Sequence, residues 1–464
     1  MPNVELTLKK TYTESMKILI KNIDTLVSCD DSDRIPRHVD LLIDGGRIAK
    51  IGTVAEQADK VIDGSVLFVY PGLVNTHHHL YQYFTRNLPE VQGFELFDWL
   101  TALYEIWKNL NSDTVLYSSL AGMAELMKYG CTTCFDHHYV FPQNADGIIE
   151  AQFEAADRLG IRMHASRGSM SLSKKDGGLP PDSVVQDVDT ILKDSARLIE
   201  KFHDPSEFSM RQMVLAPCSP FSVTADLMRE SAVLARQYGV RLHTHLCETK
   251  DEERFTLEKT GMRPYAYMES LGWTGPDVFY AHGIHFNDEE LKELARTQTG
   301  VAHCPCSNMK LSSGTARIPE MLKLGVPVGL AVDGSASNDA SNLLDEIRVA
   351  YLLHRLTWGE KAPTGYDILK MATRGSARLL GRNDIGQLSE GKAADLFAIR
   401  KDRAVMLCAE KDPANLFGTV GYHQPVDLVI VNGRETVRDG ELLTVDEEEI
   451  RRGGAVAVER LLNA

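Results

Sequence analysis

The chain has 464 residues, 43% of them hydrophobic, and a formal net charge of −15 from 50 basic and 65 acidic side chains. This length and composition allow a large buried core, arranged as one large domain with an appendage or as two to three domains. The acidic balance argues against nucleic acid or an anionic membrane as a partner, because both attract clustered positive charge.

The sequence also indicates the compartment of the protein and the state of its cysteines. The opening stretch MPNVELTLKKTY matches neither a signal peptide nor a transit peptide. No apolar run approaches the roughly 18 residues that a membrane span needs. The eight cysteines are scattered along the chain, which disfavours a disulfide framework. We therefore expect a cytoplasmic protein.

Both ends of the chain predict β-structure. Residues 15–66 and 385–445 consist of short stretches with alternating polar and apolar residues, joined by Gly-containing turns and without a long helical segment. They predict a small β-sandwich assembled from residues 1–66 and 385–464. This sandwich would flank a central domain at 67–384.

The central domain has a regular α/β pattern. Short β-rich runs alternate with helix-length amphipathic segments, several of which end in Gly, the usual residue just past a helix C-terminus. Since no GxGxxG motif follows an early strand, the pattern favours a (β/α)8 TIM barrel over an open doubly wound sheet. The eight candidate strands are residues 67–77, 132–138, 161–168, 212–219, 240–246, 278–284, 300–307 and 326–334.

Two cysteine pairs have the spacing of half a zinc-thiolate site: CTTC at 131–134 and CPC at 304–306. Each lies in an apolar run that predicts a buried strand, and no second CxxC lies near either. We interpret both pairs as small core residues.

Polar residues gather where the predicted barrel strands end, which is where TIM barrels carry their chemistry. Any one histidine at a strand end can equally be a hydrogen-bonded structural residue. The residues concerned are His77 and His79 on the first strand, His245 and Glu248 on the fifth, His282 on the sixth and Asp333 on the eighth.

Strand geometry sharpens this interpretation. Side chains two residues apart point to the same face of a strand, so His77 and His79 can bind one ion while His78 faces away. Together with His245 and Asp333 they form a set of three nitrogens and one oxygen. Such a set suits zinc and leaves a position for water.

Motifs in a fixed order now carry a family resemblance. PGLVNTHHH, HTHLCET, AHGIH, VDGSASND and IGQLSEGKAADL resemble the amidohydrolase superfamily, in particular its single-metal deaminase and chlorohydrolase branch, over nearly the whole chain. The resemblance implies that His77, His79, His245 and Asp333 bind one metal ion. Strand four, QMVLAPCSP, lacks the carboxylated Lys or acid that two-metal members need.

The resemblance also implies the catalytic roles. Glu248 would be the general acid/base, and His282 would hydrogen-bond the water or the developing oxyanion without binding the metal. Asp333 would accept the proton of the water. Zinc is the expected ion, ferrous iron suits the same set, and a homo-oligomer is the expected assembly.

The substrate is suggested by further stretches. Residues 137–142, 166–186, 216–224 and 332–342 look closest to bacterial 8-oxoguanine deaminases, a group within this branch whose relatives act on guanine, isocytosine and pterins. This resemblance implies a metal-dependent hydrolytic deaminase of an oxopurine-like ring. Candidate substrate-binding residues at the rim are Gln82, Tyr139, Trp99 and Asn338, which offer amide, phenol and aromatic groups.

Some of these positions have other interpretations. Trp99 is as well explained as the core of a helix covering the site. Cys306 stands where Ser is more usual, and Tyr83 and Phe84 stand where smaller residues are more familiar. These departures leave the chemistry untouched but leave the identity of the ring open.

Two alternative functions remain. An s-triazine hydrolase, which expels chloride or an amine, would use the same metal site. A non-catalytic binding protein would keep the barrel without the chemistry, but four ligands and two catalytic residues are all present here.

Overall fold

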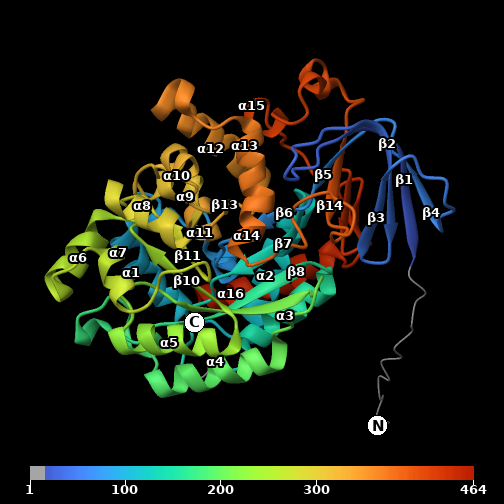
Figure 1. Cartoon of the computed structure of the whole chain (residues 1–464). Helices are drawn as coiled ribbons and strands as arrows, with labels where there is room; N and C mark the ends of the chain where they lie inside the picture. The colour runs from blue at the N-terminus through green and yellow to red at the C-terminus, as the bar shows by residue number, and fades with distance from the viewer. Residues whose placement is uncertain (1–15, 144) are drawn as a thin grey trace, which may run out of the picture.

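The computed structural model describes residues 16–143 and 145–464. It confirms the predicted α/β architecture, an eight-stranded parallel barrel with a separate sheet built from both ends of the chain (Figure 1). We expect that the stretch MPNVELTLKKTY is not a targeting segment, and this stretch lies outside the described residues. Among the described helices, none combines the length and hydropathy of a membrane span.

The barrel strands follow one another in chain order, each hydrogen-bonded in parallel to the next. Their carboxyl ends therefore meet at one rim, because parallel strands all run the same way. They are β6 (Leu73–Asn75), β7 (Cys131–Asp136), β8 (Arg162–Ser169), β9 (Arg211–Pro217), β10 (Arg241–Leu246), β11 (Val278–His282), β12 (Gly300–His303) and β13 (Val328–Leu330).

Bonds across the seam between β6 and β13 close the barrel. The Thr76 hydroxyl donates to the carbonyl of Leu330 at 3.0 Å, and the Val332 N–H donates to Oδ1 of Asn75 at 3.0 Å. The Asp333 N–H donates to the carbonyl of His77 at 3.1 Å. The closing bonds thus bring the chain after the first strand against the chain after the last.

Amphipathic helices surround the barrel, and several begin at a side-chain cap. Asp187 accepts from the Thr190 N–H at the start of α4. Gly239 ends α5 in the left-handed conformation, as the pattern of helical segments ending in Gly predicts. The longer helices are α1 (Leu96–Trp107), α2 (Ser112–Lys128), α3 (Ile148–Leu159), α4 (Val188–Phe202), α5 (Ala225–Tyr238), α6 (Lys250–Thr260), α8 (Asp288–Thr297) and α12 (Leu343–Trp358).

Shorter helices lie between these elements, and some of them form the loops at the rim. The first is the 3₁₀ helix η1 (Leu80–Thr85), directly after the histidine cluster. The others are α7 (Pro264–Ser270), α9 (Pro305–Lys310), α10 (Ile318–Leu324), α11 (Ser335–Asn338), α13 (Gly365–Lys370), α14 (Ser376–Leu379) and α15 (Leu416–Thr419).

The second sheet joins the two ends of the chain in the order β17-β16-β15-β14-β5-β1-β2-β3, with β4 paired to β1. Figure 1 shows the blue N-terminal strands beside the barrel with β14 next to them. The strands are β1 (Lys17–Leu26), β2 (Arg37–Asp44), β3 (Arg47–Gly52), β4 (Lys60–Asp63), β5 (Leu67–Pro71), β14 (Leu396–Arg400), β15 (Leu428–Val431), β16 (Arg434–Arg438) and β17 (Glu441–Leu442).

The predicted strand 67–77 is divided at Gly72. The strand β5 pairs with β14 in the terminal sheet, whereas β6 pairs with β7 in the barrel. A Cβ at Gly72 would lie 2.1 Å from the hydroxyl of Thr132, so only glycine fits where the chain crosses between the two sheets.

The last helix, α16 (Glu447–Leu462), returns to the barrel. Glu447 pairs with Lys128 of α2 at 2.7 Å, and Glu449 pairs with Arg158 of α3 at 2.6 Å. The C-terminal segment therefore covers the outside of the barrel as well as completing the terminal sheet.

One buried ion pair connects the two sheets. Arg162 of β8 lies 3.0 Å from Asp395, which precedes β14, and both side chains are buried. Removing one member of such a pair leaves an uncompensated buried charge.

We expect Asp395→Asn to lower the free energy of unfolding by about 3 kcal/mol, because Arg162 would lose its counter-charge. Chemical denaturation measures the loss. The control is Asp402→Asn, which removes the exposed partner of Arg400 and should leave the midpoint unchanged. Equal midpoints for the two variants would contradict this account.

Candidate functional site

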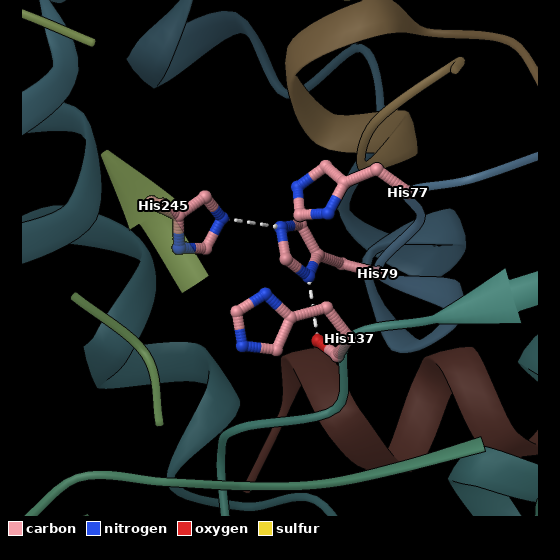
Figure 2. Close-up of side chains that lie close together, drawn as sticks. All are labelled: His77, His79, His137 and His245. Carbon is pink, nitrogen blue, oxygen red and sulfur yellow. Dashed lines mark hydrogen bonds between the residues drawn. The ribbon is translucent and has the colours of Figure 1, made fainter. Parts of the chain in front are cut away.

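Three histidines and one carboxylate converge at the carboxyl rim of the barrel. His77 and His79 follow β6, His245 lies in β10, and Asp333 follows β13. The Nε2 atoms of His77 and His79 each lie 3.3 Å from Oδ1 of Asp333, and Nε2 of His79 lies 3.1 Å from Nε2 of His245. The rings of the three histidines face one another (Figure 2).

This spacing fits a metal ion. A tetrahedral zinc ion with bonds of about 2.0–2.1 Å to nitrogen holds its ligand atoms about 3.3–3.5 Å apart. The observed separations of 3.1 to 3.3 Å lie close to that range. The donor set also leaves room for a water ligand, as catalytic zinc sites do.

Hydrogen bonds orient each imidazole. Nδ1 of His79 lies 2.7 Å from the carbonyl of His137, and Nδ1 of His245 lies 2.7 Å from the carbonyl of Cys218. A carbonyl only accepts, so both Nδ1 atoms carry the hydrogen and both Nε2 atoms present a lone pair. Backbone acceptors of this kind fix the tautomer of metal-binding histidines.

His77 is oriented by a further histidine that sequence reasoning missed. Nδ1 of His243 lies 2.9 Å from the carbonyl of Phe279, so Nδ1 is the donor and Nε2 accepts from Nδ1 of His77 at 2.8 Å. A signal existed, because His243 stands two residues before His245 and so shares its face of the strand. His77 is thereby left with a free Nε2.

Burial sets the charges of these groups. It lowers the pKa of His77 to about 3 and that of His245 well below its ordinary value, so both rings are neutral and able to bind a metal. Burial alone would raise the pKa of Asp333, but its close approach to His77 and His79 outweighs burial and holds that pKa well below its usual range. Asp333 is therefore ionised.

Glu248 lies beside this cluster with the opposite charge state. Burial, with the charge of Asp333 adding to it, raises the pKa of Glu248 to about 8. Its Oε2 lies 3.4 Å from Nε2 of His282, and its Oε1 accepts from the hydroxyl of Ser313 at 3.4 Å. The carboxyl group is therefore protonated at neutral pH and can donate.

His282 stands between the two carboxyl groups. Its Nε2 lies 4.0 Å from Oδ2 of Asp333, and its Nδ1 contacts Oδ1 of Asn308 at 2.9 Å. The backbone is left-handed at Cys247 (φ 54°), His282 (φ 71°) and Asp333 (φ 65°), and all three are non-glycine residues at strand ends of the rim. Such backbone strain concentrates at functional sites.

A cavity of about 30 Å³ opens onto these groups. The cavity is therefore small and is enclosed largely by side chains of the rim. Three lining residues, Leu96, Trp99 and Leu100, belong to α1, which covers the site. Leu311 and Phe221 add further apolar wall.

Three of the four predicted substrate-binding residues line this cavity. They are Gln82 in η1, Tyr139 after β7 and Trp99 in α1. The Oε1 atom of Gln82 and the indole nitrogen of Trp99 are buried without a hydrogen-bond partner among the described residues. A buried polar atom of this kind gains a partner when a polar ligand arrives.

Asn338, the fourth, does not line the cavity. Its Nδ2 donates to the carbonyl of Val332 at 2.6 Å and to the carboxyl group of Glu346, and its Oδ1 accepts from the Ala340 N–H at 3.1 Å. The side chain of Asn338 therefore stabilises the loop after β13 and does not face the cavity. Ser337, its neighbour, lines the cavity and donates to Asp333 at 3.4 Å.

The cysteine pairs are placed as follows. Cys131 and Cys134 lie buried in β7, as the predicted strand implies. The strand expected to include Cys306 instead ends at His303, and Cys306 lies half-buried in α9, whose first residue is Pro305. A proline at the first helical position favours this early helix start. Within the described part of the chain, no cysteine belongs to a group able to hold a metal.

Known proteins are similar to this chain in sequence and in structure. A family model described as the amidohydrolase family matches residues 68–436. This chain belongs to the amidohydrolase family. It is therefore a hydrolase, and the relatives identified below act on C–N bonds or hydrolyse triazines.

Two curated proteins resemble this amidohydrolase along most of its length. An 8-oxoguanine deaminase of Pseudomonas aeruginosa is 46% identical over 410 residues, which cover 88% of this chain and 91% of the relative. A hydroxydechloroatrazine ethylaminohydrolase of Pseudomonas sp. (strain ADP) is 40% identical over 454 residues, 94% of each chain.

A solved structure is also similar. The atrazine chlorohydrolase of Arthrobacter aurescens TC1 complexed with zinc superposes with a TM-score of 0.92 at 35% identity, covering 95% of this amidohydrolase and all of that chain. Together with the histidine-rich cluster, this likeness supports one divalent metal ion per chain.

The two neighbouring histidines should respond differently to the same substitution. His77→Asn should weaken metal binding, whereas His78→Asn should leave it unchanged, because His78 points to the hydroxyl of Ser341 at 2.9 Å. Metal analysis of the purified variants measures this. Equal loss of metal from both variants would contradict the placement of His78 away from the ion.

Proposed function

We propose that this amidohydrolase is a zinc-dependent hydrolytic deaminase of an oxopurine-like ring, with 8-oxoguanine as the first candidate, converted to urate and ammonia. Guanine, isocytosine and pterins are further candidates. The observation that carries the proposal is the position of the buried Glu248 carboxyl group, 3.4 Å from Nε2 of His282 and next to a metal-ligand set. The 46% identity to an 8-oxoguanine deaminase supports the choice of ring.

The metal would be held by His77, His79, His245 and Asp333. Zinc is proposed because three neutral imidazoles and one carboxylate suit it and because a similar structure is complexed with zinc; ferrous iron suits the same donors. When bound, the ion would lower the pKa of a water molecule toward about 7 and so supply the nucleophile at neutral pH.

The side chains would divide the proton transfers. Glu248 would donate its proton to a ring nitrogen while water adds to the neighbouring carbon, and Asp333 would accept the proton of that water. His282 would hydrogen-bond the oxygen as negative charge develops on it. The proton on Asp333 would then pass to the leaving amine, which departs as ammonia, and the hydroxyl proton of the intermediate would return to Glu248 as the carbonyl forms. General acid and base help of this kind contributes about 100- to 10,000-fold.

The cavity supports a polar, planar substrate. Gln82 offers an unpartnered amide oxygen, and Trp99 offers an unpartnered N–H, so a ring that carries both donors and acceptors would satisfy them. Tyr139 lies edge-on to His79 with ring centroids 5.0 Å apart, close to where the ring would sit.

An s-triazine hydrolase is the second candidate. It is favoured by the 40% identity to a hydroxydechloroatrazine ethylaminohydrolase and by the likeness to a zinc-complexed atrazine chlorohydrolase. Both reactions would use the same metal site, so the fold cannot separate them.

Release of ammonia from oxopurines, measured beside release of amine or chloride from triazines, separates the two candidates. Zinc-loaded protein is supplied with 8-oxoguanine, guanine, isocytosine and hydroxylated triazines. We expect release of ammonia from an oxopurine. Turnover of a triazine with no turnover of any oxopurine would support the second candidate instead.

Glu248→Gln tests the general acid. The variant should retain its zinc and lose about 100- to 10,000-fold in kcat, because an amide cannot donate the carboxyl proton. Zinc analysis and steady-state kinetics are measured on the same sample. The control is Glu253→Gln, in α6 and outside the cavity lining, which should keep both its zinc and its kcat. Most of the activity surviving in a fully loaded Glu248→Gln protein would refute the assignment.

Gly334→Ala tests the placement of Gln82. An added Cβ would lie 1.9 Å from Oε1 of Gln82, so the amide must move. We expect kcat/KM to fall about 10- to 100-fold, since small displacements of positioning groups have effects of this size. Zinc content should be unchanged. The control is Gly93→Ala, where a Cβ meets nothing within 4 Å. Unchanged kinetics in Gly334→Ala would remove Gln82 from the substrate site.

A further inference from the structure

A fourth imidazole faces the three histidines of the site, and it is not used by the proposed reaction. His137 directly follows β7 and is fully buried. Its Nε2 lies 2.8 Å from the carbonyl of Ala216. Because a carbonyl only accepts, Nε2 carries the hydrogen, and the lone pair of this neutral ring is on Nδ1.

The Nδ1 atom of His137 has no hydrogen-bond partner among the described residues. Figure 2 shows the His137 ring turned with one nitrogen toward His79 and His245. The ring packs on that of His245 with centroids 4.7 Å apart, and its centroid lies 5.4 Å from that of His79. The lone pair on Nδ1 of His137 therefore points into the space between the other imidazoles.

Candidate ligand atoms form two overlapping groups within the described chain. One joins His77, His79, His137 and His245, with one ligand atom from each and all four atoms within 4.8 Å of one another. The other joins His77 with His282 and Asp333. The Nδ1 atoms of His77, His79 and His245 are already engaged, so their contribution to the first group is Nε2.

We propose that His137 is a metal ligand and that His77, His79, His137 and His245 form a closed, four-nitrogen position for a divalent transition metal. This position adjoins the one completed by Asp333 and shares three of the ligands assigned to the metal under the proposed function. A set of four imidazoles suits zinc, cobalt, nickel or copper ions.

The two positions differ in charge and in openness. Four neutral ligands leave the double charge of the ion uncompensated in a buried place, so this position binds more weakly than the one with ionised Asp333. Four imidazoles form a closed set of the kind seen in structural zinc sites, and none of them is an ionised group that could accept a proton from water. An ion held there is retained but inactive.

The metal should therefore stay bound when the carboxylate of Asp333 is removed. In Asp333→Ala, zinc should remain bound through the four imidazoles, although turnover is lost. Replacing His137 as well should then lower zinc affinity by at least about tenfold, since even the loss of a group that merely orients a ligand costs 10- to 100-fold.

Zinc affinity is measured by competition with a chelator in Asp333→Ala, Asp333→Ala/His137→Phe and Asp333→Ala/His138→Phe. His138 is a matched control, because it is equally buried, its Nε2 contacts the carbonyl of Val140 at 2.7 Å, and its Nδ1 also lacks a partner among the described residues. However, it lies outside the four-histidine group. We expect only the His137 change to weaken binding.

Two results would overturn the proposal. One is loss of zinc from Asp333→Ala itself, and the other is equal affinity with and without His137. X-ray absorption of zinc-loaded Asp333→Ala keeps the proposal testable if the double variant does not fold. Four imidazole ligands are expected there, and three would contradict the proposal. None of these readouts uses turnover, so failure of the proposed deaminase activity would be seen separately, in the wild-type assay.

Discussion

The seam between the first and last strands of the barrel is the constraint on which the site depends. Thr76 bonds to Leu330, Asn75 bonds to Val332, and the carbonyl of His77 accepts from Asp333. These bonds close a parallel barrel and in doing so place the first pair of histidines against the last carboxylate. Residues more than 250 positions apart thus become neighbours because of how the sheet closes, without a dedicated binding loop.

Different surroundings then give two buried, nearby acids opposite protonation states. Asp333 lies against the imidazoles of His77 and His79, which hold its pKa down, whereas burial and the negative charge of Asp333 raise the pKa of Glu248. Environments that push two pKa values apart are how one site holds an acid and a base at the same pH. The neutral imidazoles complete this arrangement, because their buried rings cannot easily take up protons that would compete with a metal.

Much of this could be predicted from sequence. The alternation of β-rich and amphipathic runs predicted the order of strands and helices correctly. The two-residue period of a strand was the basis for separating His77 and His79 from His78, although β6 ends at Asn75, before all three. The fold class and family are confirmed; the metal and catalytic assignments remain predictions.

The rest depended on three-dimensional contacts. The crossing at Gly72 could not be seen from local sequence, because residues on both sides of it have the same strand propensity and only the contact with Thr132 divides them. Asn338 was expected at the pocket, but the turn after β13 directs its amide to Val332 and Glu346. His137 and His243 lie within predicted strands. Which of the several strand-end histidines face one another depends, however, on the register and tilt of neighbouring strands.

The crossing at Gly72 also means that the two sheets are not separable modules. Only Gly72 lies between β5 and β6, and His77 follows β6 after a single residue, so the terminal sheet is joined to the catalytic rim by a nearly extended and sterically tight piece of chain. A barrel excised without its flanking strands would begin with an unanchored end at the histidine cluster. The terminal sheet is thus a rigid support for the histidine cluster, and a change in that sheet would displace His77 and His79 directly.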